Sequence, residues 1–246
     1  MKRNIIVILV LLNLLCTHNI YSQITEKKID FNFLIGANLG ATTPVPIPGD
    51  LKITGYNPRL NPKLGVNIAY YFNRNWGVGS GLTVDWKGMK VHTKVNNVHL
   101  SVNVPNVGTL TGYVTGKNRT KVNSVYLVQP VYGVYRFNNP QWKVKAGIYM
   151  AETLYRKFNG NVTDVIITVE QPVVQELNIA YATLDYSNDA RKFDMGLLAG
   201  TEFLINDHVG FFADFTWGLT PYFFKRVPIH FTMRNIYFSI GATFRI

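Results

Sequence analysis

The sequence is poor in cysteine, in charge and in long apolar runs, and each shortage excludes a class of protein. Cys16 is the one cysteine among 246 residues, so neither an intramolecular disulfide nor a cysteine-based zinc site is expected. Charged residues make up 16% of the chain, which is little for the surface of a soluble domain. No run of 18 or more apolar residues occurs, which excludes a membrane-spanning helix.

The N-terminal residues form a unit of their own. Lys2 and Arg3 precede an apolar run of 11 residues, 5–15, and a short polar segment follows at 17–22. This order is typical of a secretory signal peptide, because a spanning helix needs about 20 apolar residues. We expect cleavage after Ser22, so that residues 1–22 are removed and residues 23–246 form a single domain. A retained membrane anchor is the alternative.

The rest of the chain alternates between apolar residues and small or polar residues. A period of two over such lengths is typical of a β-strand with one apolar face and one polar face, the polar one being called here the wet face. The closing stretch shows it well, since Phe238 and Ile240 alternate with Ser239 and Gly241. Eight such strands are predicted, at 31–41, 60–72, 76–89, 122–137, 142–158, 190–205, 209–219 and 235–246.

The strand at 122–137 has an ambiguous pattern. If Gln129 and Gly133 face inward, then Val128, Tyr132 and Val134 face outward. Pro130 lacks a backbone N–H, so we expect a bulge or a local gap in the hydrogen-bond ladder beside it.

The connections alternate between short turns near 73–75, 138–141 and 206–208 and long loops near 42–59, 90–121, 159–189 and 221–234. This asymmetry, with an even strand count, predicts an all-β fold: an eight-stranded antiparallel up-and-down transmembrane β-barrel with short periplasmic turns and long extracellular loops. A soluble barrel would place its large apolar side chains inside, but eight strands cannot house so many tryptophan and phenylalanine rings. Lipid outside and a polar interior satisfy the pattern.

The wet faces of these strands carry charges that the barrel would enclose. An isolated buried charge is costly, so acids and bases should pair inside the lumen. The predicted lumen network consists of Asp85, Lys87, Lys143, Lys145, Asp194, Glu202, Asp214 and Arg245.

Three segments resemble the PorT-like outer-membrane beta-barrel family. They are Ile35-Gly-Ala-Asn-Leu-Gly40, Tyr126-Leu-Val-Gln-Pro-Val-Tyr-Gly-Val-Tyr-Arg-Phe137 and Phe193-Asp-Met-Gly-Leu-Leu-Ala-Gly-Thr-Glu202. The resemblance implies an integral protein of the outer membrane of a Gram-negative bacterium. Since PorT is tied to type IX secretion, it also implies a possible structural or assembly role in an envelope or secretion complex.

The C-terminus also resembles the signal that the barrel assembly machinery reads. Its elements are Ser239, Gly241, Phe244 and the final hydrophobic residue, Ile246. The chain departs from the common pattern because it ends in isoleucine in place of phenylalanine or tyrosine.

Two predicted loops are basic. The formal charge of +11 falls to +9 without Lys2 and Arg3, so the surface should attract anions. Phosphate groups of lipopolysaccharide are candidate ligands, and a solvated face without a ligand is the alternative. The candidate contacts are Lys90, Lys94, Lys117, Arg119, Lys225, Arg226 and Arg234, with Lys121, His92 and His99 in the same loops. Segments 95–104, 162–174 and 177–184 are β-like and predict strands that extend the barrel.

The leading function is a non-enzymatic structural or assembly component of an envelope or secretion complex. The alternative is a surface barrel that uses its basic loops for adhesion or to bind ligands or lipopolysaccharide. A barrel enzyme that modifies lipid A is a weaker third. Ser101 lies near His99 in sequence, but no orienting carboxylate completes a recognisable motif. We therefore expect no enzyme activity, cofactor or metal. The expected partners are outer-membrane lipid, lipopolysaccharide and the barrel assembly machinery, together with other envelope or secretion proteins. An exported protein is not expected to bind nucleic acid.

Overall fold

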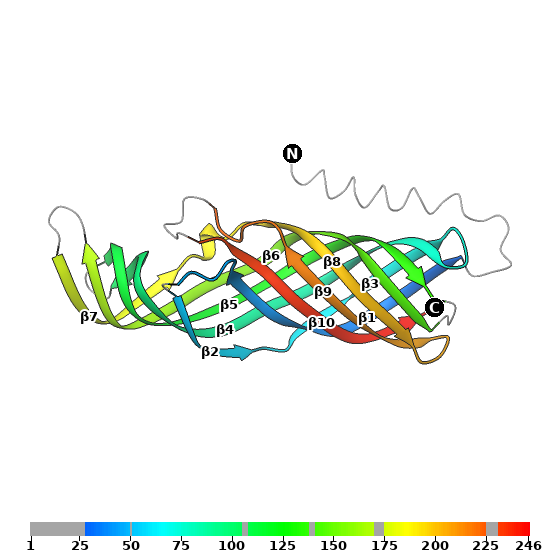
Figure 1. Ribbon diagram of the computed structural model, residues 1–246, viewed down its shortest axis with the longest axis horizontal. Coiled ribbons are helices and arrows are strands. Elements are labelled where there is room, and N and C mark those ends of the chain that lie inside the picture. Colours follow the sequence, from blue (N-terminus) through cyan, green and yellow to red (C-terminus); the bar gives the residue numbers. More distant parts are fainter. Residues whose placement is uncertain (1–27, 50, 105–107, 138–140, 170–174, 225–230) are drawn as a thin grey trace.

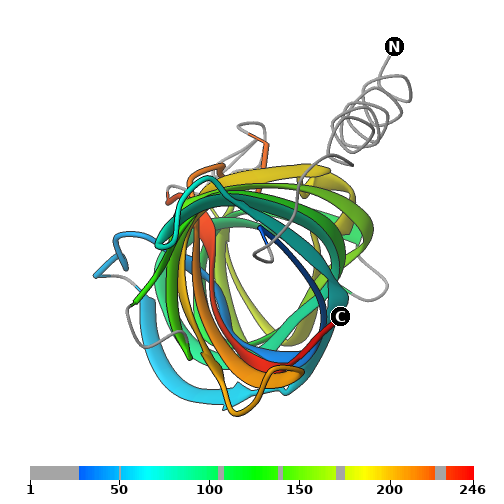
Figure 2. The same ribbon diagram turned by 90° about the vertical axis from the view of Figure 1, so that its right-hand side faces the viewer.

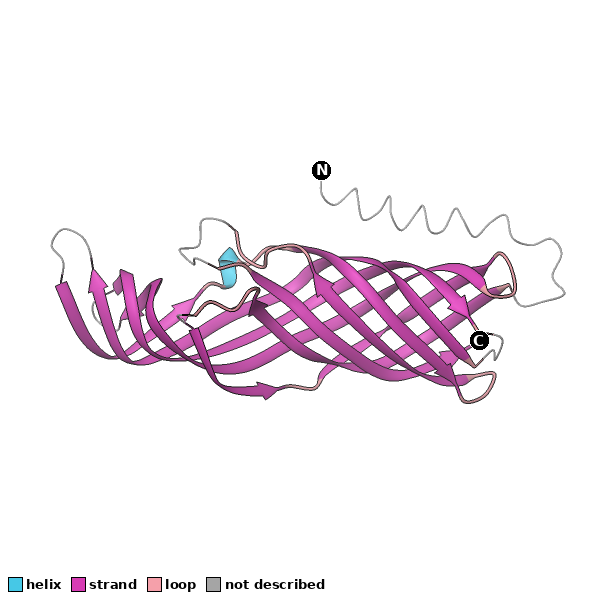
Figure 3. Ribbon diagram, in the orientation of Figure 1, coloured by secondary structure: helices cyan, strands magenta, loops and turns pink. Residues whose placement is uncertain are grey.

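The computed structural model describes residues 28–49, 51–104, 108–137, 141–169, 175–224 and 231–246. These residues form ten β-strands and a three-residue 3-10 helix (Figure 3). The strands are β1 (Ile29–Pro44), β2 (Leu51–Pro58), β3 (Asn61–Tyr71), β4 (Trp76–Val104), β5 (Gly108–Arg136), β6 (Trp142–Val169), β7 (Gln175–Asp185), β8 (Phe193–Leu204), β9 (Val209–Gly218) and β10 (Met233–Arg245), and the helix η1 is Ser187–Asp189. Within the described part of the chain, no helix is long and apolar enough to cross a membrane.

The antiparallel pairings of eight strands close on themselves. They run from β1 through β3, β4, β5, β6, β8 and β9 to β10. β10 then pairs with β1 from Asn32↔Arg245 to Pro44↔Met233, which closes the ring between the last strand and the first (Figure 2). The predicted pairing of the last strand with the first is confirmed, and the all-β antiparallel prediction holds.

The strands differ in number from the prediction, because two of the expected long loops contain strands of their own. β2 lies within the expected loop 42–59 and pairs with β4, and β7 lies within 159–189 and pairs with β6. Residues 159–169 of that loop continue β6, and residues 90–104 and 108–121 continue β4 and β5; residues 170–174 of the β-like segment 162–174 lie outside the described residues. The predicted extension by β-like segments is therefore confirmed.

The extension is long compared with the closed ring. β4 and β5 have 29 residues each, which at ~3.3 Å per residue corresponds to roughly 95 Å. The parts of β4, β5 and β6 beyond the ring, with β7, are called here the extension (Figure 1). The opposite end, called the turn end, carries the C-terminus and the short connections at 72–75 and 205–208.

Two turns at the turn end use the same local hydrogen bonds. The Asn73 side-chain oxygen accepts from the backbone N–H groups of Asn75 (2.9 Å) and Trp76 (2.7 Å). The Asn206 oxygen accepts in the same way from His208 (2.9 Å) and Val209 (2.7 Å). An asparagine side chain that folds back on its own backbone stabilises a tight reversal, so both strand pairs can be joined by few residues. The third predicted turn, at 138–141, lies largely outside the described residues.

The orientation that we considered for 122–137 is wrong. Val128, Tyr132 and Val134 are 4–6% exposed and face the interior, and Gly133 faces outward. The interior therefore accepts apolar side chains on this strand. The expected gap beside Pro130 is confirmed, because the β4–β5 register passes from Ser80↔Val131 directly to Thr83↔Val128.

Candidate functional site

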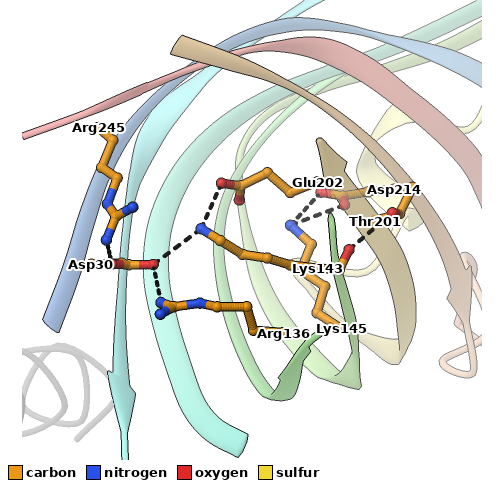
Figure 4. A network of polar contacts seen from close by, with 8 residues as sticks. All are labelled: Asp30, Arg136, Lys143, Lys145, Thr201, Glu202, Asp214 and Arg245. Atoms are coloured by element: carbon orange, nitrogen blue, oxygen red, sulfur yellow. Dashed lines mark hydrogen bonds and ion pairs between the residues drawn. The ribbon is translucent and has the colours of Figure 1, made fainter. Parts of the chain in front are cut away.

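Asp30 is the centre of the charge network at the turn end of the lumen. Its side chain is fully buried and lies within 3.0 Å of the Lys143 ammonium and the Arg136 guanidinium. Arg245 donates to its other oxygen. Lys143 also reaches Glu202 at 3.0 Å, so five residues from five strands form one connected cluster (Figure 4).

Further ion pairs lie deeper in the lumen. Lys145 is 3.0 Å from Asp214, and Lys63 is 2.9 Å from Asp85. Thr83 donates a second hydrogen bond, of 2.8 Å, to Asp85. All of these side chains are nearly inaccessible, so each pair supplies the compensation that a buried charge requires.

Lys87 is held mainly by aromatic rings. Its ammonium lies 5.0 to 5.3 Å from the ring centres of Tyr126, Tyr149 and Tyr237. A cation over a ring face is attracted by the ring quadrupole, and the attraction strengthens when water is excluded. Tyr149 donates to Asp194 at 3.0 Å, which adds a negative charge to the same layer.

The structure places all eight predicted lumen charges inside the ring. Asp85, Lys87, Lys143, Lys145, Asp194, Glu202 and Asp214 are at most 9% exposed, and Arg245 is half-buried. Sequence reasoning missed Asp30, Lys63 and Arg136. Lys63 shares its parity with Gly65 and Asn67 on the wet face, and Asp30 shares its parity with Asn32, so extending the alternation would have found both.

Gly241, part of the predicted assembly signal, also has a packing role. It pairs with Gly36 across β1 and β10. A Cβ atom on either glycine would lie 2.7–2.8 Å from the Phe212 ring, so the two glycines make room for this buried side chain. Ser239 donates to the Asn38 side chain at 2.6 Å, whereas Phe244 and Ile246 are exposed.

The two faces of β4 exchange character partway along the strand. In the ring, Asp85 and Lys87 face inward and Leu82 faces outward. In the extension, Met89 and Val95 face inward and are each 3% exposed. The inward side chains of the extension belong to one apolar core that also includes Val114, Val122, Val162 and Ile167. The outward side chains become basic instead.

The outward basic residues face one another across strands. In the β4–β5 register Lys90 pairs with Lys121, His92 with Arg119, and Lys94 with Lys117. Lys52 on β2 pairs with Lys94 from the other side. We call the six exposed cations of these rows the basic face; they are Lys52, Lys90, Lys94, Lys117, Arg119 and Lys121.

Among the described residues, one acidic side chain forms an ion pair with the basic face. Asp164 of β6 lies 2.8 Å from the Lys117 ammonium, and both side chains are more than 60% exposed. The hydrogen bond to Asp164, together with its negative charge, raises the pKa of Lys117, so this amine is protonated at neutral pH. A hollow of about 220 Å³ lies beside Lys90, Arg119 and Lys121.

Four of the predicted lipopolysaccharide contacts therefore come together, namely Lys90, Lys94, Lys117 and Arg119. Arg234 does not join them, because it lies on β10 and donates to the Gly218 and Leu219 carbonyls. Lys225 and Arg226 lie outside the described residues. Lys52 was missed because the sequence offers no sign that β2 pairs beside β4.

The side chains considered for catalysis have other neighbours. The His99 ring packs edge-on against Tyr113 at 5.3 Å, and the Ser101 hydroxyl lies 2.8 Å from that of Thr111. Among the described residues, no group of three or more histidine, cysteine, aspartate or glutamate side chains could hold a metal ion.

No curated protein matches the chain. Similar solved structures include the attachment invasion locus protein Ail of Yersinia pestis (12% identity, 89% of this chain and 97% of that chain, TM-score 0.35). Others are Neisserial surface protein A (9%, 89% and 97%, TM-score 0.34) and OprG from Pseudomonas aeruginosa (11%, 88% and 95%, TM-score 0.31). At these identities and TM-scores the similarities carry no argument about function.

A family model gives the more specific result. The model for the outer membrane protein beta-barrel domain matches residues 21–223, which is most of the chain. The chain therefore belongs to the outer membrane protein beta-barrel domain family.

Proposed function

We propose that the protein is an integral eight-stranded barrel of the outer membrane whose basic face binds the phosphate groups of lipopolysaccharide. In this proposal residues 1–22 are a cleaved signal peptide, the turn end is periplasmic and the extension lies outside the cell. A narrower place among PorT-like members is also a proposal, supported by the sequence resemblance.

The outward face of β4 supports this placement in the membrane. Trp76, Val78 and Leu82 are 41–54% exposed, and the outward apolar side chains continue as far as Trp86. A tilted spanning strand needs about 9–11 residues, which corresponds to 76–86. Lys90 then lies four residues, or ~13 Å along the strand, beyond the apolar band. Lipopolysaccharide phosphates lie at this outer boundary of the acyl layer.

The observation that carries the proposal is the set of opposed basic pairs. Like charges directly opposite each other on a sheet are destabilising. Two rows show this arrangement, Lys90 with Lys121 and Lys94 with Lys117, and between them His92 lies opposite Arg119. A bound phosphate would offset the repulsion by accepting charge-assisted hydrogen bonds from both strands.

The test is binding of purified barrel in phosphatidylcholine nanodiscs to lipid A with and without its phosphates. We expect the double variant Lys90→Glu, Lys121→Glu to bind phosphorylated lipid A about tenfold more weakly, a difference of ~1.4 kcal/mol. Arg74→Glu, an exposed residue in the turn after β3, is the matched control and should bind normally. Equal binding of phosphorylated and dephosphorylated lipid A by the wild type would contradict the proposal.

A structural or assembly role in an envelope or secretion complex is a second candidate. β7 pairs with β6 along most of its length. On its other edge, the described residues show a single pairing with β4, at Asn103↔Thr183. An unpaired strand edge can accept a strand from another protein. Native pull-down from detergent-solubilised membranes tests this role: a stoichiometric envelope protein would support it, and lipopolysaccharide without a protein partner would count against it.

A further inference from the structure

The apolar interior of the extension contains a cavity of about 270 Å³. It lies where β1, β2, β4 and β5 come together, beyond the charged layers of the lumen. Its walls include Met89, Val95, Phe158, Leu184, Tyr186 and Met233, and none of its described lining residues is charged. A site with this lining disfavours ions, because a charge moved into it would lose its hydration without a partner.

Among the polar side chains of the lining, two carry an unpaired polar atom. Thr93 on β4 and Asn118 on β5 are cross-strand partners, and both line the cavity. Thr93 is 5% exposed. Among the described residues, the Thr93 hydroxyl and the Asn118 carbonyl oxygen have no hydrogen-bond partner. Buried polar atoms are normally paired, so these two point to a ligand with one hydrogen-bonding group.

In the described part of the chain, the wall beside the cavity contains a stretch without backbone pairing, between β1 and β2, which we call the seam. β1 pairs with β3 as far as Asn38↔Asn61, and among the described residues no backbone pairing joins its remaining part to β2. Figures 1 and 2 both show β2 bowed outward there. Ala41 on β1 and Ile53 on β2 line the cavity from the two sides of this seam. The contact across it is a 2.7 Å hydrogen bond from the Tyr56 hydroxyl to the Gly40 carbonyl.

We propose that this cavity binds a small, uncharged, mostly apolar molecule that carries one hydroxyl or similar group, and that the ligand enters through the seam between β1 and β2. The apolar part packs against the core of the extension, and the polar group bonds to Thr93 and Asn118. The volume lies near the lower end of small-molecule sites, which suits a medium-chain alcohol better than a whole lipid. This inference does not depend on phosphate binding by the basic face.

The test uses a decanol that carries a photoreactive diazirine, with the full barrel in phosphatidylcholine vesicles and labelled peptides mapped by mass spectrometry. Labelling of peptides that contain Met89, Val95 or Leu184 should saturate, and excess 1-decanol should reduce it more than tenfold. Peptides with the outward residues Phe238 and Ile240 are the internal reference, because probe dissolved in the bilayer should label them without saturation.

Two variants separate the polar anchor from the apolar space. Thr93→Val keeps the side-chain shape but removes the hydroxyl, so about five- to tenfold more 1-decanol should be needed for competition, with no change for decane. Val95→Trp should abolish the saturable labelling by filling the cavity. Labelling that rises linearly on all peptides of the wild type would overturn the proposal, and this result does not depend on whether either variant folds. Unchanged 1-decanol competition in Thr93→Val would overturn the assigned ligand class.

Discussion

At the residue scale, Asp30 occupies the most demanding position in the lumen. One carboxylate with no exposed surface compensates the charges of Arg136, Lys143 and Arg245. Replacing one partner of a buried ion pair leaves the other charges without compensation, which costs more than the pair contributes. If the charge of Asp30 is removed, Glu202 can still compensate the charge of Lys143, but it has no ion pair with Arg136 or Arg245 among the described residues.

Asp30→Asn should therefore destabilise the barrel by about 3 kcal/mol. The free energy of unfolding is measured by urea titration in phospholipid vesicles, followed by tryptophan fluorescence. The matched control is Asp164→Asn, which removes an exposed ion pair with Lys117 and should cost less than ~1 kcal/mol. Equal losses in the two variants would show that burial of Asp30 has little energetic weight.

Individual lumen residues could be predicted where the alternation is regular. Asp194 alternates in step with Gly196 and Gly200, and Asp214 with Thr216 and Gly218, so their direction was clear. Arg136 could not be placed, because the lumen also accepts Val128, Tyr132 and Val134. A lumen filled by tyrosine rings is a property of the assembled barrel, and the parity of one strand does not reveal it.

At the element scale, β4 joins two environments within one strand. Up to Lys87 its inward side chains are polar, and from Met89 onward they are mainly apolar, while the outward face changes in the opposite sense. The alternation of inward and outward residues continues without a register shift from Asp85 to Val95, so the exchange of character lies in the side chains alone; the bulge of β4 comes later, between Val95 and Val98. If polar residues are assumed to face inward along the whole strand, the pattern fails after residue 89. This explains why 90–121 was predicted as a loop.

The extension should depend on its apolar core independently of the ring. Val162 is fully buried in this core, and its neighbour Thr163 is exposed on the opposite face of β6. Val162→Asp places a carboxylate among apolar side chains and should unfold the extension, whereas Thr163→Asp should not.

Limited proteolysis of intact vesicles gives the measurement. Val162→Asp should be cleaved within 90–121 and 159–185 at least tenfold faster than Thr163→Asp, with the ring still showing the heat-dependent gel mobility of a folded barrel. Equal cleavage rates in the two variants would mean that the extension does not depend on its interior packing.

At the scale of the whole molecule, the protein combines an outward apolar band on the ring, a charge-filled lumen and an extension with its own apolar core. The ring follows from strand parity and short turns, and both were readable in the sequence. The basic residues of β4 and β5 were readable too, but the cavity and the addition of Lys52 to the basic face were not, since these arise from β2 and β6 pairing beside the β4–β5 hairpin. Which strands become neighbours there depends on how the whole sheet closes.

The central claim is that the outward face of β4 passes from lipid to water between Trp86 and Lys90. Its most direct test is a nitroxide scan, with Cys16 replaced by serine and single cysteines at 78, 82, 86, 90 and 94 in phospholipid vesicles. Positions 78, 82 and 86 should be relaxed by oxygen and protected from a polar nickel chelate, and positions 90 and 94 should show the reverse. Oxygen-dominated relaxation at 90 and 94, or access of the chelate at 78 and 82, would contradict the account.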